Sequence, residues 1–240
     1  MIPALRQNLE RLEDAIGAAC RIAGRPRAEI ELMAVSKTFP TETIFEAASL
    51  GLTLFGENRV QEFSSKASLL SPRPKGTRYH LIGHLQSNKA ARAAELFDGI
   101  DSLDSLRLAG RLNEAAAKLA RRLPVLIEVK LSPEETKSGV APDSEEAAQL
   151  LDAMSSLSHL ELRGLMTIAP WGAPEPETRA CFRSLRQLRD RWAVIHPRLD
   201  FSVLSMGMSG DFPLAIAEGA TRIRVGTALF GKRTLQPGND

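Results

Sequence analysis

Apolar residues are spaced along this chain in two ways that predict different elements. Near the N-terminus they recur every three or four residues, which predicts an amphipathic helix. The apolar positions of this helix are Leu5, Leu9, Leu12, Ile16 and Cys20. Gly24 and Pro26 follow and are expected to end it. Beyond this point, short apolar runs alternate with longer segments that carry the helical period.

Eight short apolar runs after the opening helix are predicted to be strands. They are Ile30–Ser36, Leu52–Phe55, Tyr79–Ile82, Gly99–Leu103, Val125–Val129, Leu162–Thr167, Phe201–Leu204 and Arg222–Val225. A segment with helical character follows each of the first seven. These segments are Thr41–Ser49, Arg59–Leu69, Asn88–Leu96, Leu106–Arg121, Ser144–Ser155, Glu177–Trp192 and Ala215–Ala217. Strands that alternate with helices indicate βαβ units and a parallel sheet.

The number of these units favours one kind of α/β fold, a single (β/α)8 barrel of the TIM type with an extra N-terminal helix. A doubly wound open sheet is the alternative. A dinucleotide-binding fold of that type needs a glycine-rich turn after its first strand, whereas residues 36–40 read Ser-Lys-Thr-Phe-Pro. We therefore expect one barrel domain over residues 1–235 and a loose C-terminal tail over residues 236–240.

Composition and charge argue against several classes of function. The 240 residues are 43% hydrophobic and 25% charged, and 31 Lys and Arg against 29 Asp and Glu leave a net charge of +2. So small an excess argues against a nucleic-acid binder, and no apolar run approaches the ~18 residues of a membrane span. Acidic residues within the opening helix argue against a targeting peptide. Cys20 and Cys181 lie far apart, and no Cys/His cluster has zinc spacing. We expect a cytoplasmic, metal-free protein.

In a barrel of this kind, the site is built from residues at the carboxyl ends of the strands. The first strand ends in Ser36-Lys37-Thr38. A lysine amine in the mouth of a barrel is partly desolvated, which lowers its pKa and makes it nucleophilic. Such lysines form Schiff bases with carbonyl substrates or with pyridoxal phosphate (PLP). The alternative is a surface lysine that begins a loop.

The ends of the next two strands are also polar. Asn58 follows the second strand, where it either lines a pocket or acts as the N-cap of the following helix. His80 and His84 lie around the end of the third strand, and Gly83 between them would let a ligand or another backbone segment approach closely. Histidines in such positions are more often structural than catalytic, so we expect no metal site there.

The last two strands are followed by small residues that suit a phosphate group. Ser209 follows the seventh strand, and Gly226 and Thr227 follow the eighth. Loops at these two positions of a barrel often bind phosphate through backbone N–H groups. If the side chain of Arg224 points inward, its guanidinium enters the mouth of the barrel. The alternative explanation for the glycine is simple turn formation.

Six motifs of this sequence resemble those of the pyridoxal phosphate homeostasis proteins. They are residues 34–37 (AVSK), 55–61 (FGENRVQ), 80–89 (HLIGHLQSNK), 164–166 (GLM), 204–209 (LSMGMS) and 224–231 (RVGTALFG). The motifs occur in the right order, and the resemblance runs through most of the chain. It implies a single-domain barrel similar to the N-terminal domain of bacterial alanine racemase.

The resemblance also implies a set of cofactor-binding residues. They are Lys37, Asn58, Ser205, Ser209, Arg224, Gly226 and Thr227, of which Ser205 is the weakest. By position, Lys37 would hold PLP covalently as an internal aldimine, and Arg224 would face the pyridine nitrogen. The phosphate would lie against Ser209, Gly226 and Thr227.

The arginine at position 224 bears on the chemistry of such a site. PLP enzymes that need a strong electron sink often pair the pyridine nitrogen with an acidic residue. A guanidinium cannot accept a proton from that nitrogen, so carbanionic intermediates would be poorly stabilised. Alanine racemases share the arginine, but they also use a tyrosine base from a further domain of a partner subunit. The only tyrosine here is Tyr79, so that second base is expected to be missing.

The expected function is therefore PLP carriage without robust catalytic turnover. Such a protein would buffer the reactive aldehyde and supply PLP to apo-enzymes, in transient contact with them, and a monomer is expected. A PLP-dependent amino-acid racemase or lyase is the alternative. A further alternative is a PLP-free aldolase that forms a Schiff base with a phosphosugar.

Overall fold

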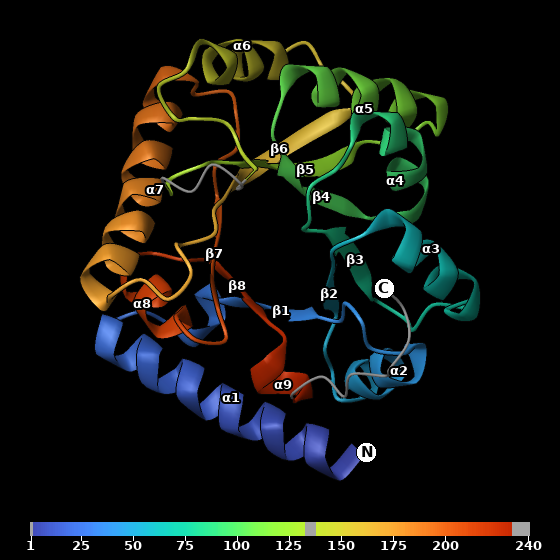
Figure 1. Cartoon of the computed structure of the whole chain (residues 1–240), viewed down its shortest axis with the longest axis vertical. Helices are drawn as coiled ribbons and strands as arrows, with labels where there is room; N and C mark the ends of the chain where they lie inside the picture. Colours follow the sequence, from blue (N-terminus) through green and yellow to red (C-terminus); the bar gives the residue numbers. More distant parts are fainter. Residues whose placement is uncertain (1, 133–137, 232–240) are drawn as a thin grey trace.

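A closed barrel of eight parallel strands forms the centre of the protein in a computed structural model, which describes residues 2–132 and 138–231. The strands are β1 (Glu31–Val35), β2 (Leu54–Glu57), β3 (Arg78–Leu81), β4 (Gly99–Leu103), β5 (Leu123–Glu128), β6 (Leu160–Met166), β7 (Val203–Met208) and β8 (Arg222–Val225). Each strand pairs in parallel with the next, and β8 pairs with β1, which closes the ring seen in Figure 1. The predicted (β/α)8 barrel is confirmed.

Helices surround the barrel (Figure 1). They are α2 (Thr41–Ser49), α3 (Val60–Leu69), α4 (Ala90–Leu96), α5 (Leu106–Lys118), α6 (Glu145–Met154), α7 (Glu175–Ile195), α8 (Phe212–Ala217) and α9 (Thr227–Phe230), with short 3-10 helices at Arg27–Glu29 and Ser87–Lys89. Two helices are capped as their sequences favour, because Ser105 Oγ accepts from the N–H of Leu108 before α5 and Ser144 Oγ accepts from the N–H of Ala147 before α6. These caps set where the two helices begin.

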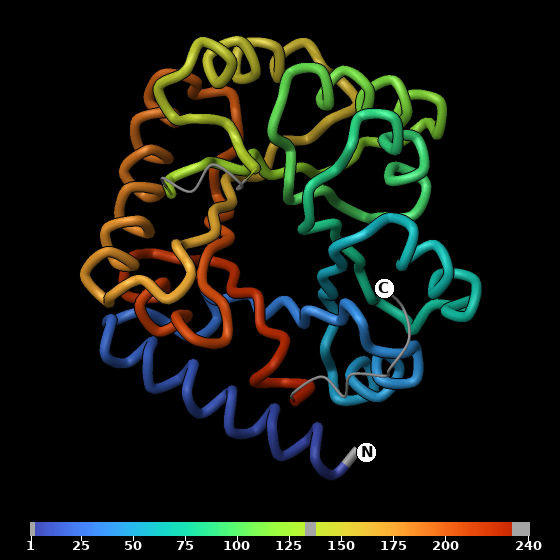
Figure 2. The backbone as a smooth tube through the Cα atoms, viewed as in Figure 1, coloured from blue at the N-terminus to red at the C-terminus, as the bar shows by residue number. Residues whose placement is uncertain are grey.

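The extra N-terminal helix, α1 (Ile2–Ala23), lies across α8 and α9, as the tube in Figure 2 shows. Its predicted apolar stripe faces the protein, since Leu5, Leu12 and Ile16 are buried. A hydrogen bond from Asn8 Nδ2 to the carbonyl of Leu229, at 2.9 Å, adds a polar contact to this packing. Helix α1 therefore supports the two short helices that follow β7 and β8.

The seventh strand lies further along the chain than its apolar pattern predicts. The pattern predicts Phe201–Leu204, whereas β7 runs from Val203 to Met208 and α8 begins at Phe212. Gly207 has a φ of +91°, and a Cβ there would lie 2.6 Å from the Cβ of Ala215, so α8 packs directly on the strand. The polar residue Ser205 ends the apolar run in the sequence, but its hydroxyl is paired inside the barrel.

A largely buried cluster of charges lies at the amino end of the barrel. Arg222 contacts Asp101 at 3.0 Å and Glu31 at 2.8 Å, and Nδ1 of His80 lies 2.8 Å from the other oxygen of Asp101. Burial raises the pKa of Asp101, but the interactions with Arg222 and His80 outweigh it and lower that pKa to about 2. Gly99 leaves room for the His80 ring, which an added Cβ would approach to 2.6 Å. The predicted structural role of His80 is thus confirmed.

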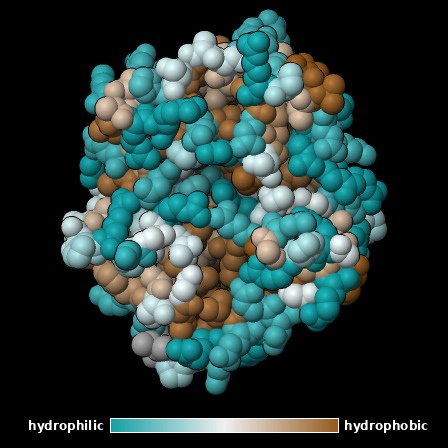
Figure 3. Space-filling model, turned by 180° about the vertical axis from the view of Figure 1, so that it is seen from behind, coloured by the Kyte–Doolittle hydropathy of each residue, from teal (hydrophilic) through white to brown (hydrophobic). Residues whose placement is uncertain are grey.

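The described residues contain neither a membrane-spanning helix nor a metal-binding cluster. Within residues 2–132 and 138–231, no helix is long and apolar enough to cross a membrane, and the face in Figure 3 is mostly hydrophilic, with smaller apolar areas. In the same residues, no group of His, Cys, Asp and Glu is arranged to hold a metal ion. Cys20 and Cys181 are both buried. The predicted tail, residues 236–240, lies outside the described residues.

Candidate functional site

A cavity of about 1080 Å³ lies at the carboxyl end of the barrel. Six of the seven predicted binding residues line it, namely Lys37, Asn58, Ser209, Arg224, Gly226 and Thr227. They come from four separate parts of the sequence, and they meet because the carboxyl ends of all the strands form one rim. The volume is ample for a small aromatic ligand.

The residue before Lys37 is fixed by a buried ion pair. The hydroxyl of Ser36 donates to Glu57 Oε1 at 2.7 Å, and Lys66 Nζ donates to the same oxygen and to the carbonyl of Ser36, both at 3.0 Å. Burial raises the pKa of Glu57, and the positive charge of Lys66 opposes this rise. Because β2 and α3 supply these two charges, the end of β1 cannot shift without breaking them.

The residue after Lys37 is held by the same network. The N–H of Thr38 donates to Glu62 Oε1 at 2.6 Å, and Lys66 Nζ lies 2.8 Å from that oxygen. Thr38 has a φ of +67°, a strained conformation for a β-branched residue. Neither Glu62 nor Lys66 lines the cavity. The network therefore acts on the backbone that carries Lys37, and the sequence alone did not predict it.

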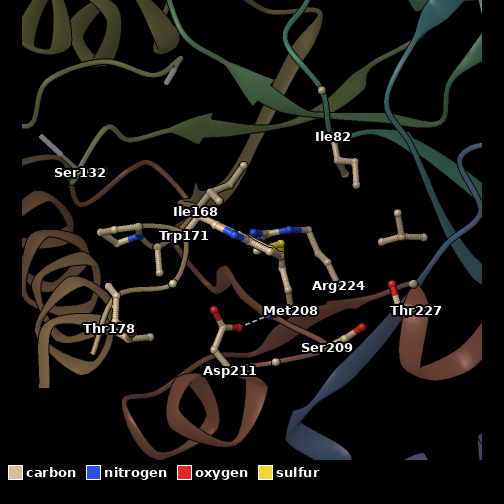
Figure 4. A pocket seen from close by; sticks show the side chains of 18 of the residues that line it. Ile82, Ser132, Ile168, Trp171, Thr178, Met208, Ser209, Asp211, Arg224 and Thr227 are labelled. Carbon is tan, nitrogen blue, oxygen red and sulfur yellow. Dashed lines mark hydrogen bonds between the residues drawn. The ribbon is translucent and has the colours of Figure 1, made fainter. Parts of the chain in front are cut away.

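Ser209 and Thr227 lie next to each other at one edge of the cavity (Figure 4). Ser209 Oγ accepts a hydrogen bond at 3.3 Å from the N–H of Ala228, which connects the loop after β7 to α9. Asp211 Oδ1 accepts from the N–H of Met208 at 2.5 Å and fixes the same loop. The hydroxyl of Ser209 on this loop and that of Thr227 at the start of α9 form a compact set of donors for an anion.

Arg224 brings a permanent positive charge into the cavity (Figure 4). Its guanidinium donates to Ser205 Oγ at 2.9 Å and to the carbonyl of Thr167 at 2.8 Å. Burial lowers its pKa, but arginine stays cationic at neutral pH. Ser205 is fully buried and does not line the cavity. Its observed contact is with Arg224, so it orients the guanidinium from behind.

Asn58 lines the cavity and does not cap the helix after it. The N-cap residue of α3 is Arg59, and it makes no side-chain capping bond. The capping explanation for Asn58 is therefore wrong, since the chain enters the helix one residue later. Gly83 allows the close approach that its position suggested, because an added Cβ would lie 2.3 Å from the carbonyl oxygen of Asn58.

One acidic residue in the cavity, Glu128 at the end of β5, was not predicted from the sequence. Its side chain is buried, and Oε2 has no hydrogen-bond partner among the residues that the structure describes. Burial raises its pKa to about 7, and the charge of Asp104 adds to this while that of Arg224 opposes it. A carboxyl group that directly ends the apolar run Val125–Ile127 was the available signal.

The single tyrosine lies away from the cavity. Tyr79 is fully buried on β3, where its ring packs 5.4 Å from that of Phe55 and 5.0 Å from that of Phe63, between centroids. It is absent from the lining residues. Tyr79 is thus a core residue and not a base for chemistry in the cavity.

The donors of the cavity fit PLP, which combines an aldehyde, a phosphate and an aromatic ring. Lys37 offers an amine, Ser209 and Thr227 offer hydroxyls, and Arg224 offers a buried guanidinium. The protein is thus a (β/α)8 barrel whose carboxyl end brings a lysine, two hydroxyl groups and a buried guanidinium to one cavity.

Comparison with known proteins identifies the family of this barrel. Residues 3–234 match the family model described as alanine racemase, N-terminal domain. The chain is 39% identical over 229 residues to a pyridoxal phosphate homeostasis protein of Haemophilus influenzae. The matched residues cover 95% of this chain and 96% of that protein. The chain therefore belongs to the alanine racemase N-terminal domain family and, within it, to the pyridoxal phosphate homeostasis proteins.

Solved structures agree with this assignment. PipY of Synechococcus elongatus PCC7942, solved with PLP bound, is 43% identical, with a TM-score of 0.78 over 90% of this chain and 100% of that chain. Alanine racemase of Clostridium difficile 630 has a TM-score of 0.72 over 96% of this chain and 57% of that one. At 15% identity, the second likeness shows the fold alone.

Proposed function

We propose that this protein binds PLP in the cavity at the carboxyl end of its barrel and carries or buffers the cofactor. The observation that carries the proposal is the meeting of Lys37, Arg224, Ser209 and Thr227 around one cavity. The protein's membership of the family and the PLP bound to PipY support the same ligand. PLP supplies an aldehyde that reacts readily with amines, and a bound molecule is kept from amines elsewhere.

Each residue has a separate part in this proposal. Lys37 would hold PLP through its amine, which would condense with the aldehyde with loss of water. Ser209 and Thr227 donate to the phosphate, together with backbone N–H groups around Gly226. Asn58 lines the pocket. The Ser36–Glu57–Lys66 contacts hold Lys37 toward the cavity.

Arg224 limits what the site does with its ligand. Because a guanidinium donates hydrogen bonds and accepts no proton, Arg224 facing the ring nitrogen leaves that nitrogen uncharged. Ser205 and the carbonyl of Thr167 fix the guanidinium in place. An uncharged ring withdraws electrons weakly. Alanine racemases share this arginine but add a tyrosine base, and the one tyrosine of this chain, Tyr79, does not line the cavity. The two features together support a carrier in preference to an efficient catalyst.

We propose further that the protein acts as a cytoplasmic monomer and hands PLP to apo-enzymes in transient contacts. Two cysteines in 240 residues, both buried, suit a reducing compartment. The name of the Haemophilus influenzae relative supports a role in PLP homeostasis.

Reduction with borohydride tests the ligand and its attachment. The wild-type protein is incubated with PLP, reduced, digested and analysed by mass spectrometry. We expect one modified peptide, the one that contains Lys37, and no modified peptide after Lys37→Ala. An adduct at the same level on other lysines in both proteins would overturn the proposal.

A PLP-dependent amino-acid racemase or lyase is a second candidate, and one observation favours it. Glu128 places a carboxyl group with a pKa of about 7 in the cavity, and an acid or base with a pKa near the working pH is well suited to proton transfer. The candidate predicts incorporation of solvent deuterium at the α-carbon of an amino acid, at a rate that depends on both Lys37 and Glu128. Exchange no faster than with free PLP would exclude it.

A further inference from the structure

Glu128 is the one buried acid among the lining residues that the structure describes, in a cavity otherwise suited to an anion. The residue is 5% exposed, and Oε2 has no hydrogen-bond partner in the described part of the chain. A buried polar atom without a partner is costly in a native structure. Its persistence beside a large cavity indicates that a ligand completes its hydrogen bonding.

Burial, and after it the charge of Asp104, favour the neutral form of Glu128. Asp104, in the segment after β4, acts on it with a like charge, and Arg224 on β8 acts with an opposite charge from further than ion-pair distance. Asp104 itself is bound by His84 at 2.9 Å. The other charged residues that line the cavity are Lys37, Lys130, Glu175 and Asp211. A protonated carboxyl is a hydrogen-bond donor, so Glu128 then adds a donor to those of Arg224.

We propose that Glu128 contacts the bound ligand as a neutral carboxylic acid, donating a hydrogen bond to an acceptor atom of the PLP ring system, and that loss of this proton weakens binding. The inference rests on the proposed function, since it assumes that the cavity holds this class of ligand. It makes Glu128 a specificity-determining residue, because it favours ligands that present an anionic or acceptor group on this side.

The physical reason is the sign of the charge. Ionised Glu128 would place a carboxylate next to an anionic ligand and would offset the positive charge of Arg224. Neutral Glu128 does neither. Glutamine has nearly the same shape, donates a hydrogen bond through its amide and does not ionise. Glu128→Gln therefore fixes the site in its binding form at every pH.

Binding of pyridoxine 5′-phosphate tests this directly, because its alcohol group cannot condense with Lys37. Isothermal calorimetry from pH 6 to 8.5 gives the affinity, and buffers of different ionisation enthalpy give the protons taken up. We expect the ratio of wild-type affinity to Glu128→Gln affinity to fall about tenfold over this range. A tenfold fall means that binding of the ligand raises the pKa of Glu128 by about one. We also expect proton uptake near pH 7.5 to be larger in the wild type.

Control variants separate this effect from others. Glu175→Gln removes an acid at the cavity rim that is paired with Arg179, and it should leave the pH profile as in the wild type. Asp104→Asn removes the like charge and should move the midpoint of the profile to lower pH. The titration of the phosphate is common to all variants and cancels in the ratio.

Two outcomes would overturn the inference, and a third concerns the proposed function. Identical pH profiles and proton uptake for wild type and Glu128→Gln would show that Glu128 does not contact the ligand. If Glu128→Gln does not fold, an unchanged midpoint in Asp104→Asn overturns the inference equally. Failure of the wild type to bind PLP or the alcohol at any pH would remove the proposed function, and the inference with it.

Discussion

The backbone N–H of Thr38 donates a hydrogen bond to Glu62 Oε1 at 2.6 Å, immediately after the lysine that enters the cavity. The same oxygen lies 2.8 Å from Lys66, which also binds Glu57 and the carbonyl of Ser36. A single buried cation thus holds the backbone on both sides of Lys37. The position of the reactive amine depends on a side chain that does not line the cavity.

Lys66→Met tests this dependence. It leaves Glu57 buried without its cation, which is expected to cost about 3–5 kcal/mol of unfolding free energy, and it releases the backbone around Lys37. We expect a lower denaturant midpoint. We also expect the folded protein, without denaturant, to form the covalent PLP complex more slowly. The control is Lys118→Met, on an exposed position of α5. Full stability and an unchanged rate in Lys66→Met would show that the network has no such role.

Ser209→Ala and Thr227→Val test the proposed phosphate edge. Each removes one hydroxyl donor to a charged group, and we expect PLP affinity to fall about tenfold for each, with little change in stability. Equilibrium titration monitored by absorbance measures the affinity. Ser68→Ala, which removes an exposed hydroxyl on α3, serves as the matched control. Affinities equal to that of the control would place the phosphate elsewhere.

Glu128 should also make the stability of the ligand-free protein depend on pH. Burial raises its folded-state pKa to about 7, above its ordinary value of 4.5, so the folded state binds the proton more tightly than the unfolded state. Its contribution to stability is therefore greatest below pH 4.5 and declines as the pH rises to about 7. We expect the stability of Glu128→Gln relative to wild type to rise by about 2 kcal/mol between pH 5 and 8. Denaturant unfolding at both pH values measures it, and a constant difference would contradict the raised pKa.

Asp101 should show the opposite dependence at the other end of the barrel. Its folded-state pKa is lowered from 3.8 to about 2 by Arg222 and His80, against the effect of burial. Its contribution to stability is complete above pH 3.8 and is lost as the pH falls through 2. Asp101→Asn should therefore reduce stability at pH 7 by at least about 2 kcal/mol, as unfolding would show. PLP affinity should stay unchanged, and a selective loss of affinity would contradict this structural role.

The barrel and most of its candidate site were predictable because both follow from local patterns. Apolar runs bounded by polar segments define the strands, and the carboxyl end of a strand must face the common rim. Lys37 and Thr227 lie within two residues of the ends of such runs, and both line the cavity. The end of β7 was misplaced because Ser205 looks like the end of a strand, although the barrel interior supplies Arg224 as its partner.

What the sequence did not show depends on contacts between distant segments. Lys66 lies on a helix, where a lysine is ordinarily expected to be exposed to solvent. Only the fold brings its amine to the carbonyl of Ser36. Glu128 ends an apolar strand, but its missing partner and raised pKa require the surrounding residues to be in place. Asn58 was open to two explanations until the start of α3 was known. The assignment of residues 1–235 to one domain stays a prediction.

The visible absorption spectrum of the purified protein with PLP, beside that of Lys37→Ala, tests the central claim most directly. We predict a band from the C=N linkage in the wild type that is absent from Lys37→Ala, although phosphate contacts leave the variant weak binding. A wild type that shows only the spectrum of free PLP would contradict the account and favour an aldolase that acts without the cofactor. The same band in both proteins would show that another lysine holds PLP.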